Sequence, residues 1–236
     1  MSLQLTLLLI PLLPLLAAAV AGLLRNQVGR SGAHWFAILG VAVSFLLSAW
    51  VLYQQVYEGL GTQNYSVYTW MISDSIRFEI GFLIDHLTTL MMCVVTFVSL
   101  MVHIYTIGYM ADDPGYQRFF SYIALFTFSM LMLVMSNNFM QLFFGWEAVG
   151  LVSYLLIGFW FNRESAIFAS LKAFLVNRVG DFGFLLGIAA VVYATGSLDY
   201  AEVFGQAPLI AQQTISIIPG MDWNLVTVIC ICLFIG

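Results

Sequence analysis

The chain has 236 residues, of which 62% are hydrophobic and only 8% are charged, and its formal net charge is −5. A soluble domain carries about 25% charged residues, so this composition excludes a protein with a fully water-facing surface. The seven basic residues form no cluster, which argues against nucleic acid as a partner. Because the apolar residues occur in long runs without alternation, they predict an all-α integral membrane protein rather than a β-barrel.

Two membrane spans are expected near the N-terminus, at Leu3–Leu24 and at about Ala33–Tyr53. The first lacks a basic segment before it and is too long for a signal peptide, so we expect a retained helix. The following residues, Tyr57–Gly81, are more polar, and strand-forming residues flank Ser73-Asp74-Ser75, which predicts a small hairpin outside the bilayer. We expect residues 1–82 to form one unit of two helices and this hairpin-like loop.

Residues 83–236 are expected to form the transmembrane core. Its complete spans are predicted at Ile84–Tyr109, Phe119–Met135, Phe139–Phe161 and Ala166–Ala194. A polar connection, with a surface helix, follows over Gly196–Trp223. Asn224–Gly236 begins a seventh span, but this segment is too short to cross a bilayer core of about 30 Å. The prediction is a polytopic bundle of about six complete helices and a truncated seventh, the N-terminal fragment of a longer protein.

The basic residues of the loops are distributed unevenly. The loops after the first, third and fifth spans contain Arg25, Arg30, Arg118 and Arg163, whereas the opposite loops contain only Arg77 beside several acids. Basic residues favour the cytoplasmic side of a membrane. This bias predicts that the N-terminus lies on the outer side.

Four charged residues interrupt the apolar fifth and sixth spans: Glu147, Lys172, Arg178 and Asp181. Inserting an Asp, Lys or Arg at a helix centre costs about 2.5–3.5 kcal/mol on insertion scales. Inserting one Leu or Phe is favourable by only about 0.3–0.6 kcal/mol. We therefore expect these side chains to face protein or water and to have partners.

Helix spacing separates the charges of the sixth span. Arg178 and Asp181 are three residues apart, so they share a face and can form an ion pair. Lys172 lies nine residues before Asp181, on the opposite side of the helix, and must face another helix. Gly180, Gly183 and Gly187 (the last two in "GFLLG") predict a face for close helix packing.

These charges favour proton transfer as the function. A carboxylate in an apolar medium holds a proton more readily, and a nearby cation reverses that tendency, so a movable cation makes the proton affinity switchable. Glu147, Lys172, Arg178 and Asp181 are the candidate residues. The alternatives are a static Arg178–Asp181 pair that fixes packing, and a Lys172 side chain that extends to the interface. His103 is expected to pack or hydrogen-bond. No motif predicts a cofactor-binding or metal-binding residue on this chain.

Three stretches resemble one protein family: "VHIYTIGYMADD" (Val102–Asp113), "GWEAVGLVSYLLIGFW" (Gly145–Trp160) and "KAFLVNRVGDFGF" (Lys172–Phe184). The family is the proton-pumping membrane subunit of NADH:quinone oxidoreductase (respiratory complex I), called chain L in bacteria and chain 5 in mitochondria. The resemblance implies an antiporter-like fold, here incomplete. It also implies that Glu147 matches an essential glutamate that pairs with a seventh-helix lysine, and that the residues matching Arg178 and Asp181 tune it.

The resemblance further implies an enzyme subunit without a redox site of its own. NADH, FMN, iron–sulfur clusters and quinone would act in the wider complex, and protons, lipid and other membrane subunits, especially a neighbouring antiporter-like subunit, would be the partners. A bacterial inner membrane is the expected location, with the mitochondrial inner membrane as the alternative. Two other functions stay open: a subunit of a Mrp-type cation/proton antiporter, and a membrane scaffold that transports nothing.

Overall fold

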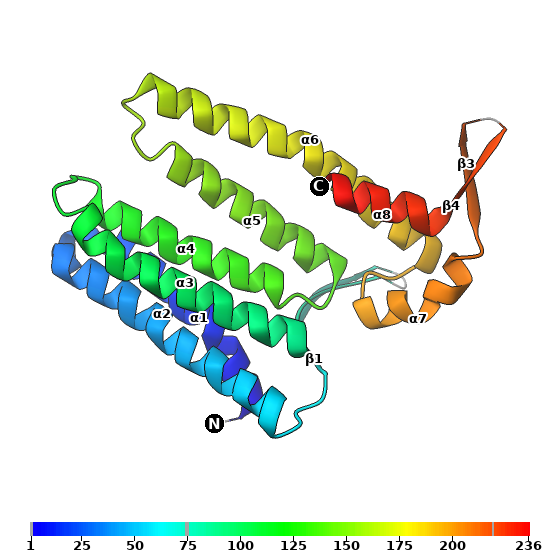
Figure 1. Cartoon of the computed structure of the whole chain (residues 1–236), viewed down its shortest axis with the longest axis horizontal. Helices are drawn as coiled ribbons and strands as arrows, with labels where there is room; N and C mark the ends of the chain where they lie inside the picture. The colour runs from blue at the N-terminus through cyan, green and yellow to red at the C-terminus, as the bar shows by residue number, and fades with distance from the viewer. Residues whose placement is uncertain (1, 74–75, 219) are drawn as a thin grey trace.

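The computed structural model describes residues 2–73, 76–218 and 220–236, which form a mainly helical molecule with two short hairpins (Figure 1). The elements in chain order are α1 (Leu3–Leu23), α2 (Arg25–Tyr57), β1 (Gln63–Ser73), β2 (Ile76–Ile84), α3 (His86–Tyr109), α4 (Tyr116–Val134), α5 (Phe139–Ile157), α6 (Glu164–Thr195), α7 (Tyr200–Ile210), β3 (Thr214–Ile218), β4 (Met221–Asn224) and α8 (Leu225–Ile235). Within the described residues, α1 to α6 are long and apolar enough to cross a membrane, as predicted.

The first four helices pack together, and α5, α6 and α8 extend from this bundle on the side of α4 (Figure 1). One core cluster joins α1, α2, β2, α3 and α4; it comprises Leu7, Ile10, Val51, Phe82, Ile84, Met92, Leu131 and Met135. A separate cluster joins α5 to α8 and comprises Phe139, Ile188, Val191, Leu198, Val203, Ile210, Leu225 and Ile229. In a bilayer such contacts stabilise by van der Waals packing, because lipid tails are as apolar as the side chains.

The helices that start on the hairpin side are capped by side chains. Asp85 accepts a hydrogen bond from the backbone of Thr88 (2.7 Å) at the start of α3, and Asn138 accepts one from Gln141 (2.8 Å) at the start of α5. Asp199 and Asn224 cap α7 and α8 in the same way. Each cap satisfies backbone N–H groups that have no partner within the helix, so the sequence fixes these helix starts.

The predicted hairpin is confirmed as the antiparallel pair β1–β2, although Asp74 and Ser75 of its expected turn lie outside the described residues. Its second strand is attached to the start of α5. Gly81 donates its backbone N–H to Oε1 of Gln141 (2.9 Å), and Asn138 donates its side-chain amide to the carbonyl of Glu79 (3.1 Å). A side chain at Gly81 would collide with Asn137, since an added Cβ would lie 2.2 Å from its amide nitrogen. The hairpin and the N-terminus of α5 therefore form one connected unit.

Two expected boundaries were wrong, and one hairpin was not predicted. The loop expected between the first two spans is mostly helical, because α2 begins at Arg25 and bends at Gly29, whose φ of 69° suits glycine. Helix α5 ends at Ile157 rather than Phe161, and Phe159 just beyond it is buried in a cluster with Tyr116 and Phe120 of α4. Strands β3 and β4 lie within the segment expected to be a polar connection, where α7 confirms the surface helix.

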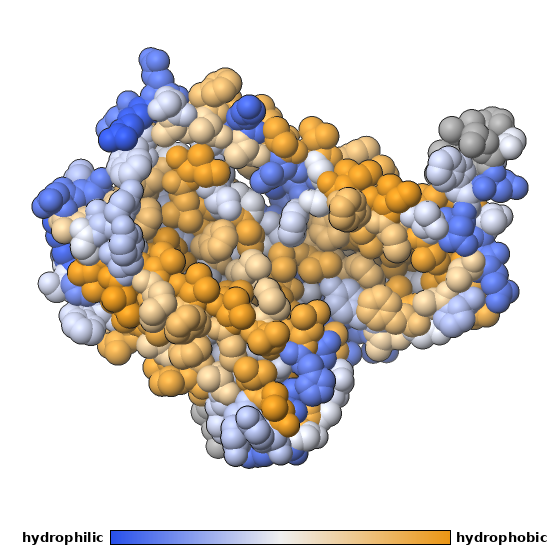
Figure 2. Space-filling model, viewed as in Figure 1, coloured by the Kyte–Doolittle hydropathy of each residue, from blue (hydrophilic) through white to orange (hydrophobic). Residues whose placement is uncertain are grey.

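Many large apolar side chains cover the outside of the molecule. Val179, Phe182 and Tyr193 on α6 are 76%, 65% and 82% exposed. In Figure 2 hydrophobic residues cover most of the helix flanks, and hydrophilic residues gather mainly at the two ends, where the loops and hairpins lie. This distribution suits a protein surrounded by lipid, and together with the six long apolar helices it identifies a multi-pass membrane protein.

Candidate functional site

The candidate site lies between α5 and α6, near the middle of both helices. Glu147 belongs to α5, and Arg178 and Asp181 belong to α6. Asp181 is only 4% exposed, while the side chains of Glu147 and Arg178 are 24% and 33% exposed. Two acids and one base therefore meet in an apolar part of the bundle, where charges need partners.

Arg178 is shared between the two acids. Its Nη1 donates a hydrogen bond to Oε2 of Glu147, and its Nη2 lies 3.0 Å from Oδ2 of Asp181. The second contact is an ion pair without hydrogen-bond geometry, so this Asp181 oxygen has charge compensation but no donor among the described residues. The Arg178–Asp181 pair predicted from the spacing of three is present, and its extension across the helix interface to Glu147 is the new element.

Trp146 completes the network on the other side of Asp181. Its indole Nε1 donates to Oδ1 of Asp181 at 2.9 Å, which gives the buried carboxylate one directional hydrogen bond. This contact was not predicted, because Trp146 lies beside Glu147 in a run of apolar residues. The tryptophan is the only group of "FFGWEAVG" with an N–H side-chain donor, and that was the available signal.

A cavity of about 400 Å³ opens beside this network. Residues of α5, α6 and the end of α8 line it: Trp146, Val149, Gly150, Ser153, Val176, Asn177, Arg178, Gly180, Asp181, Ile235 and Gly236. Arg178 therefore touches both the cavity and Glu147. A cavity of this size with several polar groups has room for hydrogen-bonded water, which can carry protons. Gly150 keeps the approach open, because a Cβ there would lie 3.3 Å from Nη2 of Arg178.

The predicted glycine face of α6 packs against α8. A Cβ added at Gly183 would lie 2.6 Å from Cγ2 of Ile235, and one added at Gly187 would lie 2.8 Å from Cδ2 of Leu233. Gly180 approaches the carbonyl of Ile235 in the same way. These close approaches confirm the packing role predicted for the glycines, and they hold α8 against the helix that carries Arg178 and Asp181.

Lys172 stands apart from this network. Its side chain is exposed, and across the described residues it makes no hydrogen bond or ion pair. Lys172 lies nine residues before Asp181, and this spacing predicted that the two side chains would not pair. They do not pair in the structure. The expected pairing of Glu147 with a seventh-helix lysine stays a prediction, and Arg178 is the cation that contacts Glu147 among the described residues.

His103 of α3 has the packing and hydrogen-bonding environment expected for it. The side chain is fully buried, and its Nδ1 lies 2.7 Å from the carbonyl oxygen of Ser99. Ser99 in turn contacts Thr127 of α4, with 2.5 Å between the two hydroxyl oxygens. This polar contact joins α3 to α4 and does not reach the charges of the candidate site.

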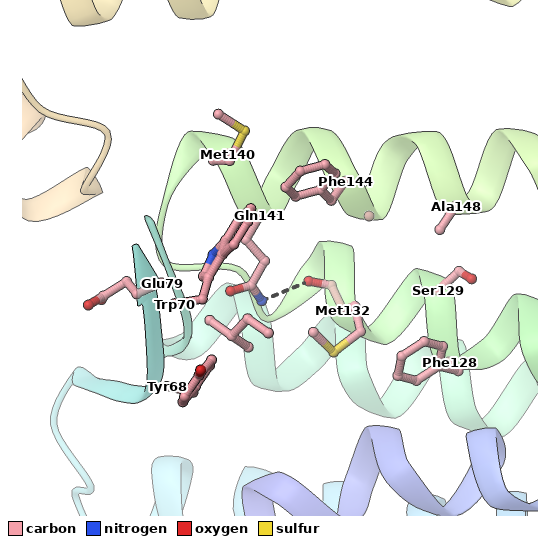
Figure 3. A pocket seen from close by; sticks show the side chains of 12 residues that line it. Tyr68, Trp70, Glu79, Phe128, Ser129, Met132, Met140, Gln141, Phe144 and Ala148 are labelled. Carbon is pink, nitrogen blue, oxygen red and sulfur yellow. Dashed lines mark hydrogen bonds between the residues drawn. The ribbon is translucent and has the colours of Figure 1, made fainter. Parts of the chain in front are cut away.

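A further cavity, of about 350 Å³, lies between the first hairpin, α4 and α5 (Figure 3). Trp70, Met132 and other apolar side chains form most of its wall. Three of its polar side chains already have partners: Gln141 donates to the carbonyl of Met132 (3.2 Å), Glu79 accepts from Ser66, and Ser129 donates to a carbonyl of its own helix. This cavity therefore offers few free polar groups for chemistry, in contrast to the one beside Arg178.

Comparison with known protein families gives two matches along the chain. Residues 70–120 match the N-terminal part of chain 5 of NADH-ubiquinone oxidoreductase (complex I), and residues 136–236 match the transmembrane family of NADH:quinone oxidoreductase and Mrp antiporters. NADH-quinone oxidoreductase subunit L of Neisseria meningitidis serogroup B is 61% identical over 97% of this chain. NADH-ubiquinone oxidoreductase chain 5 of Triticum aestivum is 45% identical over 97% of it. The chain spans about a third of the length of these relatives (34% of each).

Two solved structures share the fold. The membrane-bound sulfane sulfur reductase, an archaeal respiratory membrane complex, contains a chain that matches 98% of this one with a TM-score of 0.77 and 22% identity, over 43% of its own length. A chain of the Mrp complex from a Dietzia species matches 98% of this one with a TM-score of 0.76 and 23% identity, over 23% of its length. The helical arrangement is thus shared with chains of these two membrane complexes. The two family matches and the relatives show that the chain belongs to the family of NADH-quinone oxidoreductase subunit L and chain 5.

Proposed function

We propose that this chain is part of a proton-translocating membrane subunit of a respiratory NADH:quinone oxidoreductase, and that redox chemistry in other subunits drives it. Family membership supports the proposal, and one observation carries it: Arg178 is shared between Glu147 and Asp181 in the apolar middle of two helices. Moving one proton against 100 mV costs about 2.3 kcal/mol, so a coupled energy source is required.

In the proposed mechanism Glu147 holds the transferred proton and Arg178 controls it. The guanidinium has two anions within reach on two helices, Glu147 and Asp181. When Arg178 stays on Glu147, the carboxylate is stabilised in its charged form. When Arg178 moves towards Asp181, the positive charge beside Glu147 is withdrawn, and Glu147 is free to take up a proton. Trp146 keeps Asp181 in place with its hydrogen bond, so Asp181 acts as a fixed second position for the cation.

The cavity beside Arg178 supplies the route for protons in this proposal. Its polar lining, from Ser153, Asn177 and Asp181, offers partners for a short chain of water molecules. Lys172 is a further candidate for proton transfer, because its ammonium group is exposed and is available to a helix or subunit outside the described residues.

The wider complex would provide the other components. NADH, FMN, iron–sulfur clusters and quinone would be bound by other chains, and the neighbouring antiporter-like subunit would be a direct partner. The bacterial relatives support a bacterial inner membrane. The bias of Arg25, Arg30, Arg118 and Arg163 to one end supports an N-terminus on the outer side. A Mrp-type cation/proton antiporter subunit is the second candidate, favoured by the likeness to the Dietzia Mrp complex.

The test replaces Glu147 by Gln in the full-length subunit of the assembled complex, with Glu58→Gln as the matched control, since Glu58 is an exposed acid of a loop. NADH oxidation and proton uptake are measured in the same membrane vesicles. We expect the Glu147→Gln complex to assemble and to lose most proton translocation, while the control keeps it. Normal pumping in Glu147→Gln would favour the scaffold alternative. Exchange that requires Na⁺ or K⁺ and proceeds without NADH would favour the antiporter.

A further inference from the structure

Three arginines meet at the end of the bundle opposite the first hairpin. Arg25 at the start of α2, Arg118 at the start of α4 and Arg163 just before α6 line one cavity of about 480 Å³. The loops from α3 to α4 and from α5 to α6 come together there (Figure 1). In a membrane protein this level is the boundary between the apolar core and the lipid headgroups.

The charge of this cavity is positive. Asp113 is the one acid among its lining residues, and it is already engaged, because its carboxylate accepts hydrogen bonds from the indole of Trp160 (2.9 Å) and the backbone of Gly115 (2.6 Å). Three guanidinium groups and one carboxylate thus line the cavity, which leaves a surplus of positive charge and suits an anionic ligand.

Two of the three arginines, Arg118 and Arg163, lie against aromatic rings. The guanidinium of Arg118 lies 4.5 Å from the ring centre of Phe159 and 5.0 Å from that of Phe161, and that of Arg163 lies 4.8 Å from the ring of Trp160. Arg118 also donates to the carbonyl of Phe159 (3.0 Å), and its buried Nε has no hydrogen-bond partner among the described residues. Guanidinium groups fixed in this way offer planar pairs of donors that match the oxygen atoms of a phosphate.

A second cavity, of about 230 Å³, adjoins the first and shares Arg118, Phe159 and Phe161 with it. It lies between α4, α5 and α6, and Tyr122, Tyr154, Leu155 and Ile167 form much of its wall. Aromatic and aliphatic side chains at this depth suit a hydrocarbon chain, and tyrosine is typical of the interface where a lipid's polar and apolar parts meet.

We propose that the two adjoining cavities bind one anionic phospholipid, with its phosphate among Arg25, Arg118 and Arg163 and the start of an acyl chain between α5 and α6. The charge surplus selects an anionic over a zwitterionic headgroup, and the apolar extension selects a lipid over a free phosphate or an acidic protein segment, which would fill only the first cavity. This binding site is independent of proton translocation.

The experiment measures phospholipid binding to the full-length subunit in detergent by native mass spectrometry, with phosphatidylglycerol and phosphatidylcholine as probes. We expect preferential retention of phosphatidylglycerol. The variant with Arg25→Gln and Arg163→Gln should bind it roughly 30-fold more weakly, from the loss of two basic groups near the membrane surface. Arg77→Gln, at the opposite end, should bind like the wild type. The variant with Arg25→Lys and Arg163→Lys should keep most of the binding, which separates lost charge from misfolding.

Two further measurements test the lipid against other anions. Leu155→Trp, which fills the second cavity, should weaken phosphatidylglycerol binding without changing the thermal stability of the subunit. Added inorganic phosphate should displace little of the lipid. Equal retention of the two lipids, unchanged binding in the double Gln variant, or full displacement by inorganic phosphate would each overturn the proposal.

Discussion

Replacing Arg178 by Met removes the only cation within contact distance of Glu147 and Asp181 among the described residues, and keeps a side chain of similar length. At 3.0 Å and an effective dielectric constant of about 20, a unit charge pair such as Arg178–Asp181 attracts by about 5.5 kcal/mol, much of which offsets the loss of hydration. Breaking a fully buried pair costs about 3–5 kcal/mol, and an exposed one at most about 1 kcal/mol.

The Arg178–Glu147 pair lies between these two limits, since the side chain of Arg178 is 33% exposed and that of Glu147 is 24% exposed. We therefore expect Arg178→Met to lower the free energy of unfolding by about 2–3 kcal/mol. Thermal unfolding of the full-length subunit in detergent measures it.

A double-mutant cycle with Glu147→Gln tests the reason for the loss. Once Glu147 is neutral, removing Arg178 leaves only Asp181 without its cation, so the second substitution should cost less than it does in the wild type. We expect the two effects to be non-additive by about 0.5–3 kcal/mol, as for residues in contact. Additive effects would refute the shared ion pair, because they would mean that Arg178 stabilises the protein without Glu147.

Three other substitutions probe separate contacts. Trp146→Phe keeps an aromatic ring but removes the donor to Asp181, and should cost about 1.5–3 kcal/mol in thermal unfolding, the range for hydrogen bonds to charged groups. Gly183→Ala should cost about 1–3 kcal/mol, because its Cβ would lie 2.6 Å from Ile235 and push α6 from α8; cross-linking between these helices should fall with it. Asp113→Asn should lower the melting temperature at pH 6 but not below the folded pKa of Asp113. The hydrogen bond from Trp160, helped by nearby arginines, holds that pKa below its usual 3.8, so the stabilisation exists above pH 3.8 and is lost as the pH falls through the lowered value.

Each of these has a matched control. Trp50→Phe replaces an exposed tryptophan of α2, Gly205→Ala adds a Cβ where no atom lies within 4 Å, and Asp112→Asn changes the neighbouring acid, which makes no hydrogen bond among the described residues. The controls should change the melting temperature little. If any control matched its test variant, the contact named for that variant would not explain its stability.

The sequence was sufficient for the helices but not for the contacts between them. Long apolar runs predicted all six spans, and the spacing of Arg178 and Asp181 predicted their pairing, because both patterns are local to one helix. The contact from Arg178 to Glu147 and the one from Trp146 to Asp181 depend on how α5 and α6 are rotated against each other. No spacing within one helix determines that rotation.

Errors at helix boundaries have a similar cause. Hydropathy extended the fifth span to Phe161, but Phe159 and Trp160 have other roles. The ring of Phe159 lies against the guanidinium of Arg118, and the indole of Trp160 donates a hydrogen bond to Asp113 in the loop. Hydropathy alone does not distinguish a side chain that faces lipid from one that supports an arginine. The hairpin of β3 and β4 was missed because short strands within a polar segment give a weak periodic signal.

The attachment of the first hairpin to α5 has a consequence for motion at the site. Asn138 and Gln141 fasten the beginning of α5 to an extramembrane strand, and Arg118 holds the loop beyond its other end through the carbonyl of Phe159. Contacts at both ends oppose movement of α5 along its axis. We therefore expect that a movement separating Glu147 from Arg178 is a shift or rotation of α6, whose first half is widely exposed. Helix α5 would stay in place.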